Sequence, residues 1–382
     1  MTGKHNLMFV SSYTGLGGGE TIQLNLIEAL GSDRYQIHLV VPGEGQFAKG
    51  ARKLGVQVHI LPFRGATTWF VPAIWTRLPA ARALSALADR LEIDVLVSNY
   101  HALPFAVAAG RAARIPVMWY SIGWWFPVRP WQRAFFRRDV TQIAAASRSV
   151  RDRWLSRSPI LSPDRIPVIF PGVNPDYFHP GVDGAPVREK LGIGPDAPLA
   201  AMLARFQHVK GHDIFQAMIP HVHAQVPEAR FAVAGENVFG VRKDERYKLA
   251  ILTRAREDPV LSQTLKYLGF YEDPRPVVAA ADVVVCPSRF ESLGMVHLEA
   301  MAMARPIVSM NNGGPAETIL DGETGFLVPP EDPAALADRV VRLLRDPALR
   351  AQMGQAGRRH VLANFTADRF AARFAQLIGD LV

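Results

Sequence analysis

The sequence predicts an α/β protein of two domains, each a parallel sheet with helices on both faces. Its 382 residues, 49% of them hydrophobic and 20% charged, are enough for two domains with separate cores. Short β-branched runs alternate with segments of helical period along the chain, as they do in parallel α/β sheets. Each half also opens with a strand, a turn rich in glycine or charge, and a helix, which is typical of nucleotide-binding folds.

The first half opens with an expected strand at 6–12, a glycine-rich turn at 15–20 and a helix through Leu24 and Ile27. The turn is not a dinucleotide fingerprint, because Glu20 takes the place of the third glycine of G-x-G-x-x-G. The next strand, at 36–41, is also followed by no acid that could bind a ribose. The other expected elements of this half are strands at 56–61, 94–98, 116–120 and 142–146, and helices at 82–91, at 105–113 and up to Arg157.

Basic and aromatic residues gather in the first half. Residues 1–180 hold 20 Lys and Arg against 11 Asp and Glu, while the remainder holds 23 against 24. Tryptophan, phenylalanine and arginine interleave between Trp119 and Arg138. Such a segment suits an anionic membrane surface, where aromatic rings settle at headgroup depth and arginines meet phosphates. Two alternatives stay open: the segment lines the wall of a binding cleft, or its aromatic residues belong to the core. Nucleic acid is not expected, since no lysine-rich stripe or nucleic-acid motif supports it.

A proline-dense segment at 165–180 is expected to link the two halves as a semi-rigid hinge. The second half begins with an expected strand at 199–203, a turn that holds Arg205 and Lys210, and a helix. A strand-to-helix turn of a parallel sheet is where phosphate binds, so these two cations are candidates for a phosphate site. The other expected elements of this half are strands at 231–234 and 282–287, and helices from 295, at 336–344 and at 365–381.

Residues 288–318 combine two acidic side chains with a helix N-terminus. Glu291 lies in the loop after the strand at 282–287, and Glu299 lies in the first turns of the helix that begins near Met295. The macrodipole and the free N–H groups of a helix N-terminus favour ionised carboxylates and can also hold a phosphate. Both carboxylates are therefore expected to ionise readily and to accept hydrogen bonds. The stretch suits a ligand that carries both phosphate and sugar hydroxyls.

The string PSRFESLGMVHLEAMAMARPIV, with its Glu-x7-Glu arrangement, resembles the signature of family 4 of the retaining, nucleotide-sugar-dependent glycosyltransferases. The resemblance covers nearly the whole chain and is strongest from 199 to 328. It implies the GT-B fold, in which two Rossmann-like domains face a central cleft. It also implies transfer of a sugar from a UDP-, GDP- or ADP-sugar to a hydroxyl acceptor, in polysaccharide or glycolipid biosynthesis or on a lipid-linked acceptor. Two alternatives stay open: a GT-B-fold sugar-nucleotide epimerase, and a nucleotide-sugar-binding protein without transferase activity.

The resemblance also implies roles for single residues. Arg205 and Lys210 would neutralise the diphosphate of the donor, Glu291 would meet the transferred sugar, and Glu299 would meet the ribose. The first three of these form the implied catalytic set. The implied donor-binding residues, several of them through their backbone, are Gly18, Gly19, Arg205, Lys210, Gly235, Phe270, Glu291, Ser292, Leu293, Gly294, Met295 and Glu299.

One position departs from the family pattern. Many members place a histidine just past the strand at 116–120, where this chain has Ile122. His101 is nearby in the sequence, and with Trp124 and Trp125 it forms the expected acceptor-side set. A hydrolase that uses two carboxylates as acid and base is a mechanistic rival. It is disfavoured here, because neither carboxylate has an evident means of raising its pKa.

No metal or other cofactor is expected, and the nucleotide sugar is a co-substrate. The chain has no Asp-x-Asp pair, and its one cysteine, Cys286, lies in an expected strand. The N-terminus is a poor match to a signal peptide and no run approaches eighteen apolar residues, so we expect a cytoplasmic protein that works at the inner face of the membrane. The expected domains are residues 1–175 and 176–364, with a C-terminal helix at 365–382 that, by resemblance, crosses back to the first domain.

Overall fold

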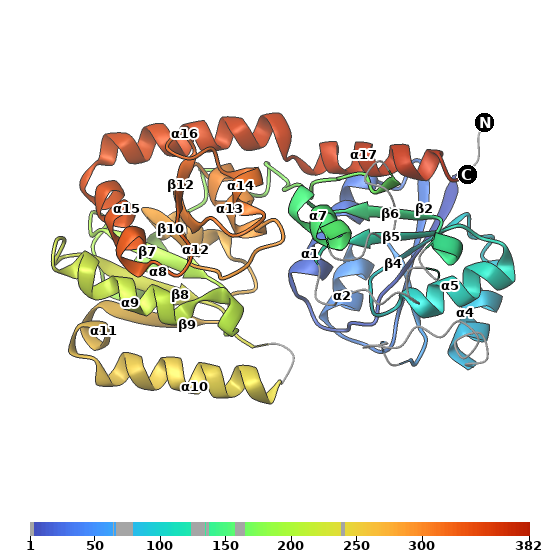
Figure 1. Ribbon diagram of the computed structural model, residues 1–382, viewed down its shortest axis with the longest axis horizontal. Helices are drawn as coiled ribbons and strands as arrows, with labels where there is room; N and C mark the ends of the chain where they lie inside the picture. Colours follow the sequence, from blue (N-terminus) through green and yellow to red (C-terminus); the bar gives the residue numbers. More distant parts are fainter. Residues whose placement is uncertain are drawn as a thin grey trace. The chain divides into compact units, whose positions relative to one another are not determined.

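The computed structural model describes residues 4–63, 65, 79–123, 134, 137–156, 165–237 and 241–382. The chain divides into two compact units (Figure 1). Unit 1 comprises residues 1–172 and 367–382, and unit 2 comprises residues 173–366. Each unit contains one six-stranded sheet whose strand pairs are all parallel. The predicted α/β class with two parallel sheets is confirmed.

The sheet of unit 1 has the order β3-β2-β1-β4-β5-β6. Its strands are β1 (His5–Val10), β2 (Tyr35–Val41), β3 (Gln57–Ile60), β4 (Val95–Ser98), β5 (Val117–Ser121) and β6 (Gln142–Ala145). Its helices are α1 (Gly18–Leu30), α2 (Gln46–Lys53), α4 (Pro79–Arg90), α5 (Leu103–Ala113), α7 (Arg148–Ser156) and α17 (Ala367–Gly379). The strand order reverses between β1 and β4, which makes this pair the switch point of the sheet.

The strands at the centre of this sheet are buried on both faces. Residues 7–10 of β1 are each at most 1% exposed, and all four residues of β4 are buried. The sequences of such central parallel strands are therefore continuous apolar runs rather than alternating apolar and polar residues. The C-terminal helix α17 belongs to this unit, where it packs along α1. Its Phe370 and Phe374 rings contact Tyr120, and Phe374 also stacks on Phe9.

The sheet of unit 2 has the order β12-β11-β10-β7-β8-β9, with its switch point between β7 and β10. Its strands are β7 (Leu199–Leu203), β8 (Arg230–Ala234), β9 (Leu265–Gly269), β10 (Val283–Cys286), β11 (Ile307–Met310) and β12 (Gly325–Val328). Its helical elements are α8 (Ala185–Leu191), the short 3₁₀ helix η2 (His208–Lys210), α9 (His212–His223), α10 (Arg242–Glu257), α11 (Pro259–Thr264), α12 (Arg275–Ala280), α13 (Met295–Ala302), α14 (Pro315–Thr318), α15 (Pro333–Arg345) and α16 (Pro347–Asn364).

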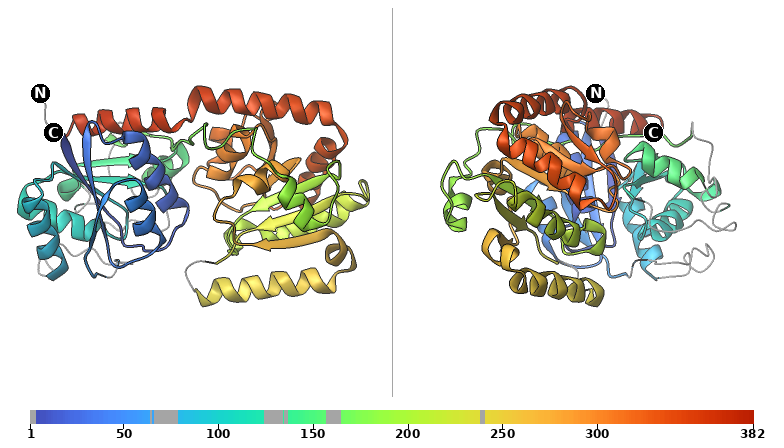
Figure 2. Two further views of the ribbon diagram at one scale, coloured as in Figure 1. Left: turned by 180° about the vertical axis from the view of Figure 1, so that it is seen from behind. Right: turned by 60° about the vertical axis from the view of Figure 1, so that its left-hand side comes forward.

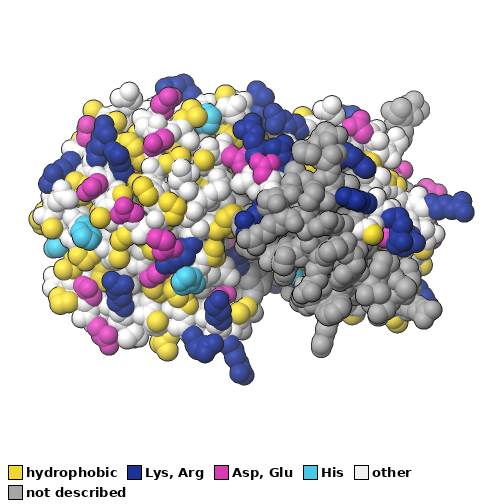
Figure 3. All heavy atoms as spheres, viewed as in Figure 1, with side chains coloured by type: hydrophobic (Ala, Val, Ile, Leu, Met, Phe, Trp, Pro, Cys, Tyr) yellow, Lys and Arg dark blue, Asp and Glu magenta, His cyan; other side chains and the backbone are white. Residues whose placement is uncertain are grey.

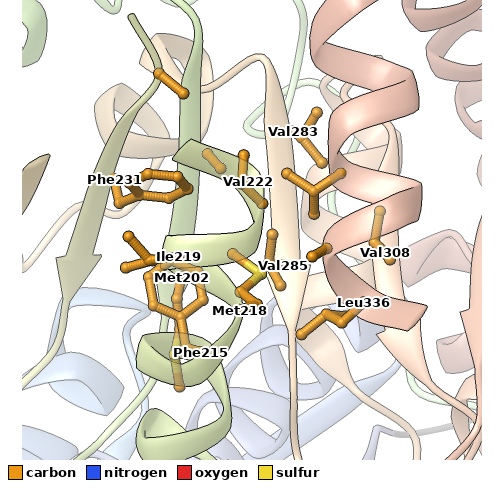
Figure 4. Close-up of a cluster of buried hydrophobic side chains, with 14 of the residues drawn as sticks. Met202, Phe215, Met218, Ile219, Val222, Phe231, Val283, Val285, Val308 and Leu336 are labelled. Atoms are coloured by element: carbon orange, nitrogen blue, oxygen red, sulfur yellow. The ribbon is translucent and has the colours of Figure 1, made fainter. Parts of the chain in front are cut away.

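The core of unit 2 lies between its sheet and the helices α9 and α15, which pack side by side (Figures 1 and 4). Figure 4 shows the α9 residues Phe215, Met218 and Ile219 facing strand side chains such as Val285 of β10, while Leu336 of α15 closes the cluster. All of these side chains are at most 1% exposed. Full burial of such a side chain stabilises the fold by about 1.5–3 kcal/mol. This cluster fixes the strands whose ends carry the site described below.

Several helices of the structure were not predicted from the sequence, and α2, α10 and α16 are the longest of them. In α10 only Ile251 and Ala255 are buried, and this helix lies along the outer edge of unit 2 in both views of Figure 2. In α16 two of the four buried residues are glycines. A Cβ on Gly354 would lie 2.1 Å from the carbonyl oxygen of Ala304, so this glycine permits close backbone packing. Neither helix therefore shows a strong apolar period in the sequence.

The surface of unit 2 shows Lys, Arg, Asp and Glu interspersed on the face drawn in Figure 3. This agrees with the near balance of charge in the second half of the sequence. Within the part of the chain that the structure describes, none of the helices has the length and apolar character needed to cross a membrane.

Candidate active site

The loops that follow β7 and β10 meet at the switch point of unit 2. The Arg289 N–H donates a hydrogen bond of 2.8 Å to the Val209 carbonyl. Gly211, at φ +72°, approaches the other loop so closely that a Cβ there would lie 2.0 Å from the Pro287 carbonyl oxygen. Open α/β sheets bind ligands at the carboxyl ends of their strands at such a point. The predicted phosphate turn and the predicted carboxylate loop therefore belong to one site.

Lys210 and Glu291 form an ion pair across this switch point, with 2.7 Å between Nζ and Oε1. The Ser288 hydroxyl donates to the same carboxylate oxygen, also at 2.7 Å. Glu291 is 9% exposed, and burial by itself raises the pKa of its carboxyl. Attraction to Lys210 and the hydrogen bonds from Lys210 and Ser288 outweigh burial and lower that pKa. Glu291 is therefore ionised at neutral pH, as predicted.

Glu299 behaves differently from Glu291, and the expectation that it ionises readily is wrong. Burial raises the pKa of its carboxyl to about 7. None of the described residues donates a hydrogen bond to this carboxyl or forms an ion pair with it. Glu299 is the fifth residue of α13, beyond the first turn over which a helix N-terminus acts. The site thus pairs a carboxylate with a carboxyl that titrates near neutrality, a pattern that acid–base hydrolases also use.

The N-terminus of α13 lies beside these carboxylates. Gly294 precedes the helix at φ +92°, a backbone conformation that favours glycine. The loop after β11 packs against this corner, because the Gly314 N–H donates to the Glu291 carbonyl at 2.9 Å. A Cβ on Gly314 would also lie 2.4 Å from the Leu293 Cα. The first N–H groups of a helix have no partner within it, so this corner can hold an anion.

Arg205, Gly235 and Phe270 lie at the same edge of the sheet, because they follow β7, β8 and β9. The Gly235 N–H donates to the Gly269 carbonyl at 2.9 Å. A Cβ on Gly235 would lie 2.0 Å from the Ala204 carbonyl oxygen and 3.3 Å from the Arg205 nitrogen. Phe270 is 52% exposed. The predicted residues of the second half therefore gather at one edge of unit 2.

Gly18 and Gly19 are in unit 1, where they begin α1. Glu20 turns back to accept a hydrogen bond of 3.0 Å from the Gly17 N–H and so caps this helix. A Cβ on Gly19 would lie 2.4 Å from Cδ1 of Ile122. Ile122, which stands where the family pattern has a histidine, therefore covers the glycine turn.

His101 follows β4 at the switch point of unit 1. Its ring makes edge contacts with Tyr13 at 5.7 Å and with Tyr100 at 5.3 Å between ring centroids. Asn99, two residues before His101, donates to the Ser11 hydroxyl at 2.9 Å and so links the ends of β4 and β1. The other expected acceptor-side residues, Trp124 and Trp125, lie outside the described residues, as do most of residues 119–138.

Sequence reasoning missed several residues of the site. Ser288 was missed because a hydroxyl three positions before an acidic residue, here Glu291, is only a weak sequence signal for a site. Arg289 forms a two-point ion pair with Asp213 of α9, at 2.9 and 2.7 Å, which ties the loop after β10 to that helix. His297 lies inside α13 and is discussed below. Across the described residues, no group of three or more His, Cys, Asp or Glu side chains is placed to hold a metal ion.

Comparison with known proteins finds glycosyltransferases that are similar to this chain. A family model described as "Glycosyltransferase Family 4" matches residues 16–177, and one described as "Glycosyl transferases group 1" matches residues 185–360. A GDP-mannose-dependent alpha-(1-6)-phosphatidylinositol monomannoside mannosyltransferase of Mycolicibacterium smegmatis is 33% identical over 273 residues, which cover 68% of each chain. A D-inositol 3-phosphate glycosyltransferase of Corynebacterium diphtheriae is 34% identical over 229 residues, which cover 57% of this chain and 51% of that protein.

Solved structures show the same architecture over nearly the whole chain. A glycosyltransferase from Rickettsia africae superposes with a TM-score of 0.84 at 18% identity, covering 99% of this chain and 98% of that one. Anabaena Alr3699/HepE, solved in complex with UDP and glucose, superposes with a TM-score of 0.79 at 20% identity, covering 98% and 99%.

The fold is therefore that of the GT-B glycosyltransferases. With the family matches and the mycobacterial relative, the chain belongs to glycosyltransferase family 4. The predicted family and enzyme class are confirmed, and transferase activity is favoured over the epimerase alternative. Family membership also decides against the hydrolase that the unequal carboxyl groups of Glu291 and Glu299 would otherwise allow.

Proposed function

We propose that the protein transfers a sugar from a nucleoside diphosphate sugar to a hydroxyl acceptor, with retention of the anomeric configuration. The proposed acceptor is a polyol that carries a phosphate and is linked to a lipid. The observation that carries the proposal is the Lys210–Glu291–Ser288 cluster beside the N-terminus of α13. It offers a fixed cation and free N–H groups for a diphosphate, next to an ionised carboxylate for sugar hydroxyls. A nucleoside diphosphate sugar carries both kinds of group.

Negative charge develops on the departing diphosphate during transfer, so its stabilisation lowers the barrier. In the proposed mechanism Lys210, Arg205 and the N-terminus of α13 supply that stabilisation. Glu291 keeps the ammonium group of Lys210 in place and accepts hydrogen bonds from the transferred sugar. Glu299 accepts hydrogen bonds from the ribose hydroxyls, and the leaving phosphate takes the proton of the acceptor hydroxyl.

The acceptor part of the proposal draws on the relatives and on the charge of the first half. The mycobacterial relative is named for a phosphatidylinositol monomannoside, and the corynebacterial relative for an inositol phosphate. Both names describe a cyclic polyol joined to a phosphate. The excess of Lys and Arg in residues 1–180 suits an anionic acceptor of this kind. We place the acceptor hydroxyl near His101, at the switch point of unit 1.

The last part of the proposal is that residues 119–138 contact the inner face of an anionic membrane. Its support is the interleaving of tryptophan, phenylalanine and arginine in the sequence. A lipid-linked acceptor would require the protein to work at such a surface.

The test is nucleotide release from a panel of UDP-, GDP- and ADP-sugars, starting with GDP-mannose, with and without a membrane lipid extract. We expect release from one donor, stimulated by the extract. We expect at least a roughly 100-fold loss in Arg205→Ala and Glu299→Ala. Arg256→Ala and Glu257→Ala, both on the exposed face of α10, are the matched controls and should keep full activity. Absence of release from every donor, with nucleotide binding intact, would refute the proposal.

A further inference from the structure

His297 is buried within the proposed donor site but has no role in the mechanism above. It is 0% exposed and is the third residue of α13. Its Nε2 lies 3.3 Å from the Ser309 hydroxyl of β11, and its Nδ1 lies 3.3 Å from the Thr318 hydroxyl at the end of α14. One ring therefore connects three elements.

The two hydroxyl partners also lie close to backbone carbonyls. The Ser309 hydroxyl lies 3.3 Å from the Cys286 carbonyl, and the Thr318 hydroxyl donates to the Pro315 carbonyl at 3.3 Å. Burial lowers the pKa of His297 to about 4, so the ring is neutral at physiological pH. A neutral imidazole donates through one nitrogen and accepts through the other. In the tautomer that carries its proton on Nδ1, the ring donates to the Thr318 hydroxyl, and the Ser309 hydroxyl donates to Nε2 in place of the Cys286 carbonyl.

The ring also lies directly against Gly294, the residue that precedes α13. A Cβ on Gly294 would lie 2.2 Å from Cε1 and 2.3 Å from Nδ1 of His297. On the other side of this corner the Gly314 N–H holds the Glu291 carbonyl at 2.9 Å. The position of the N-terminus of α13 relative to Glu291 is thus set by two supports, the ring of His297 and the loop at Gly314.

We propose that His297 is a positioning residue for the donor. It holds the N-terminus of α13 in place beside Glu291, so that the helix N–H groups and the carboxylate meet the diphosphate and the sugar of one bound molecule. His297 itself touches neither. The inference rests on the proposed function, because it takes the ligand to be a nucleoside diphosphate sugar.

The experiment compares His297→Phe, His297→Asn and His297→Gln in the chain of 382 residues. His297→Phe keeps a planar ring without hydrogen bonds, whereas Asn can replace the Nδ1 contact and Gln the Nε2 contact. We measure kcat and the KM for the donor, the Kd for UDP and GDP by calorimetry, and the melting temperature. The matched control is His38→Phe in unit 1, since His38 is also buried and bonded through its ring, to His59 at 3.2 Å.

We expect His297→Phe to raise the donor KM and the nucleotide Kd by roughly 10- to 100-fold at temperatures where it remains folded. At least one of the Asn and Gln variants should recover to within about threefold of wild type. His38→Phe should lower the melting temperature without changing the donor KM. Where His297→Phe does not fold, the Asn and Gln variants carry the test, and we expect the two to differ from each other in nucleotide Kd.

The inference is overturned if the folded variants bind nucleotide and donor like wild type, whatever their melting temperatures. This outcome differs from a failure of the proposed function. If the proposed function fails, wild type binds a nucleoside diphosphate but transfers no sugar. A higher nucleotide Kd in His297→Phe would still support the positioning role in that situation.

Discussion

At the scale of single residues, Glu299 connects burial to pH dependence. Its pKa is raised from 4.5 to about 7, so ionisation in the folded state costs free energy that the unfolded chain does not spend. The cost begins as the pH rises above the unfolded pKa and is complete above the folded pKa. Because the side chain is partly exposed, we take the full cost as about 1–3 kcal/mol.

We therefore expect Glu299→Gln to be more stable than wild type by about 1–3 kcal/mol at pH 8, and by roughly 1 kcal/mol or less at pH 5. Urea unfolding at the two pH values measures the difference. Glu257→Gln, at an exposed site on α10, should change little at either pH. An equal effect of Glu299→Gln at pH 5 and pH 8 would contradict the raised pKa.

Lys210 and Glu291 form a coupled pair at the same scale. Lys210→Met should destabilise the protein by about 3 kcal/mol at pH 8, because it leaves the Glu291 carboxylate buried without its cation. The double variant Lys210→Met/Glu291→Gln should recover most of that loss. A double-mutant cycle by urea unfolding gives the coupling energy. Additive effects of the two changes would show that the ion pair does not hold the loops together.

At the scale of elements, the close approach of the loops after β7 and β10 requires glycine at position 211. An alanine there would meet both an unfavourable φ of +72° and the Pro287 carbonyl oxygen at 2.0 Å. Gly192 is a matched control, because its φ is +69° and no atom lies within 4 Å of a Cβ built on it. We expect Gly192→Ala to cost about 1 kcal/mol and Gly211→Ala at least about 3 kcal/mol. Similar unfolding free energies for the two variants would contradict the steric part of this account.

The same scale shows what the sequence could predict. The strand β7 and the start of α13 were predicted where the structure has them, because apolar runs bounded by turn residues carry a strong local signal. The helix α16 was missed, since glycines take part of its buried face. The raised pKa of Glu299 was also missed. It depends on the packing around α13, which no local pattern contains, whereas the family motif did point to the carboxylate itself.

At the scale of the whole molecule, the basic excess of residues 1–180 predicts attraction to anionic surfaces. We expect the protein to float with vesicles that contain phosphatidylinositol or phosphatidylglycerol and not with pure phosphatidylcholine vesicles. Binding should weaken as salt rises from 50 to about 300 mM, because screening shortens the reach of surface charge. Binding that is independent of lipid charge and of salt would contradict this part of the proposal.

The central claim is that unit 2 holds the donor of a sugar-transfer reaction at the ends of β7 and β10. The most direct measurement is transfer of a labelled sugar from the active donor to its acceptor by wild type, Glu291→Gln and the exposed control Glu257→Gln. We predict transfer with retained anomeric configuration by wild type and by the control. We also predict a loss of at least roughly 100-fold in Glu291→Gln, with UDP and GDP affinities changed little. Full transfer by Glu291→Gln would contradict the claim, because the carboxylate at the switch point would then have no part in the reaction.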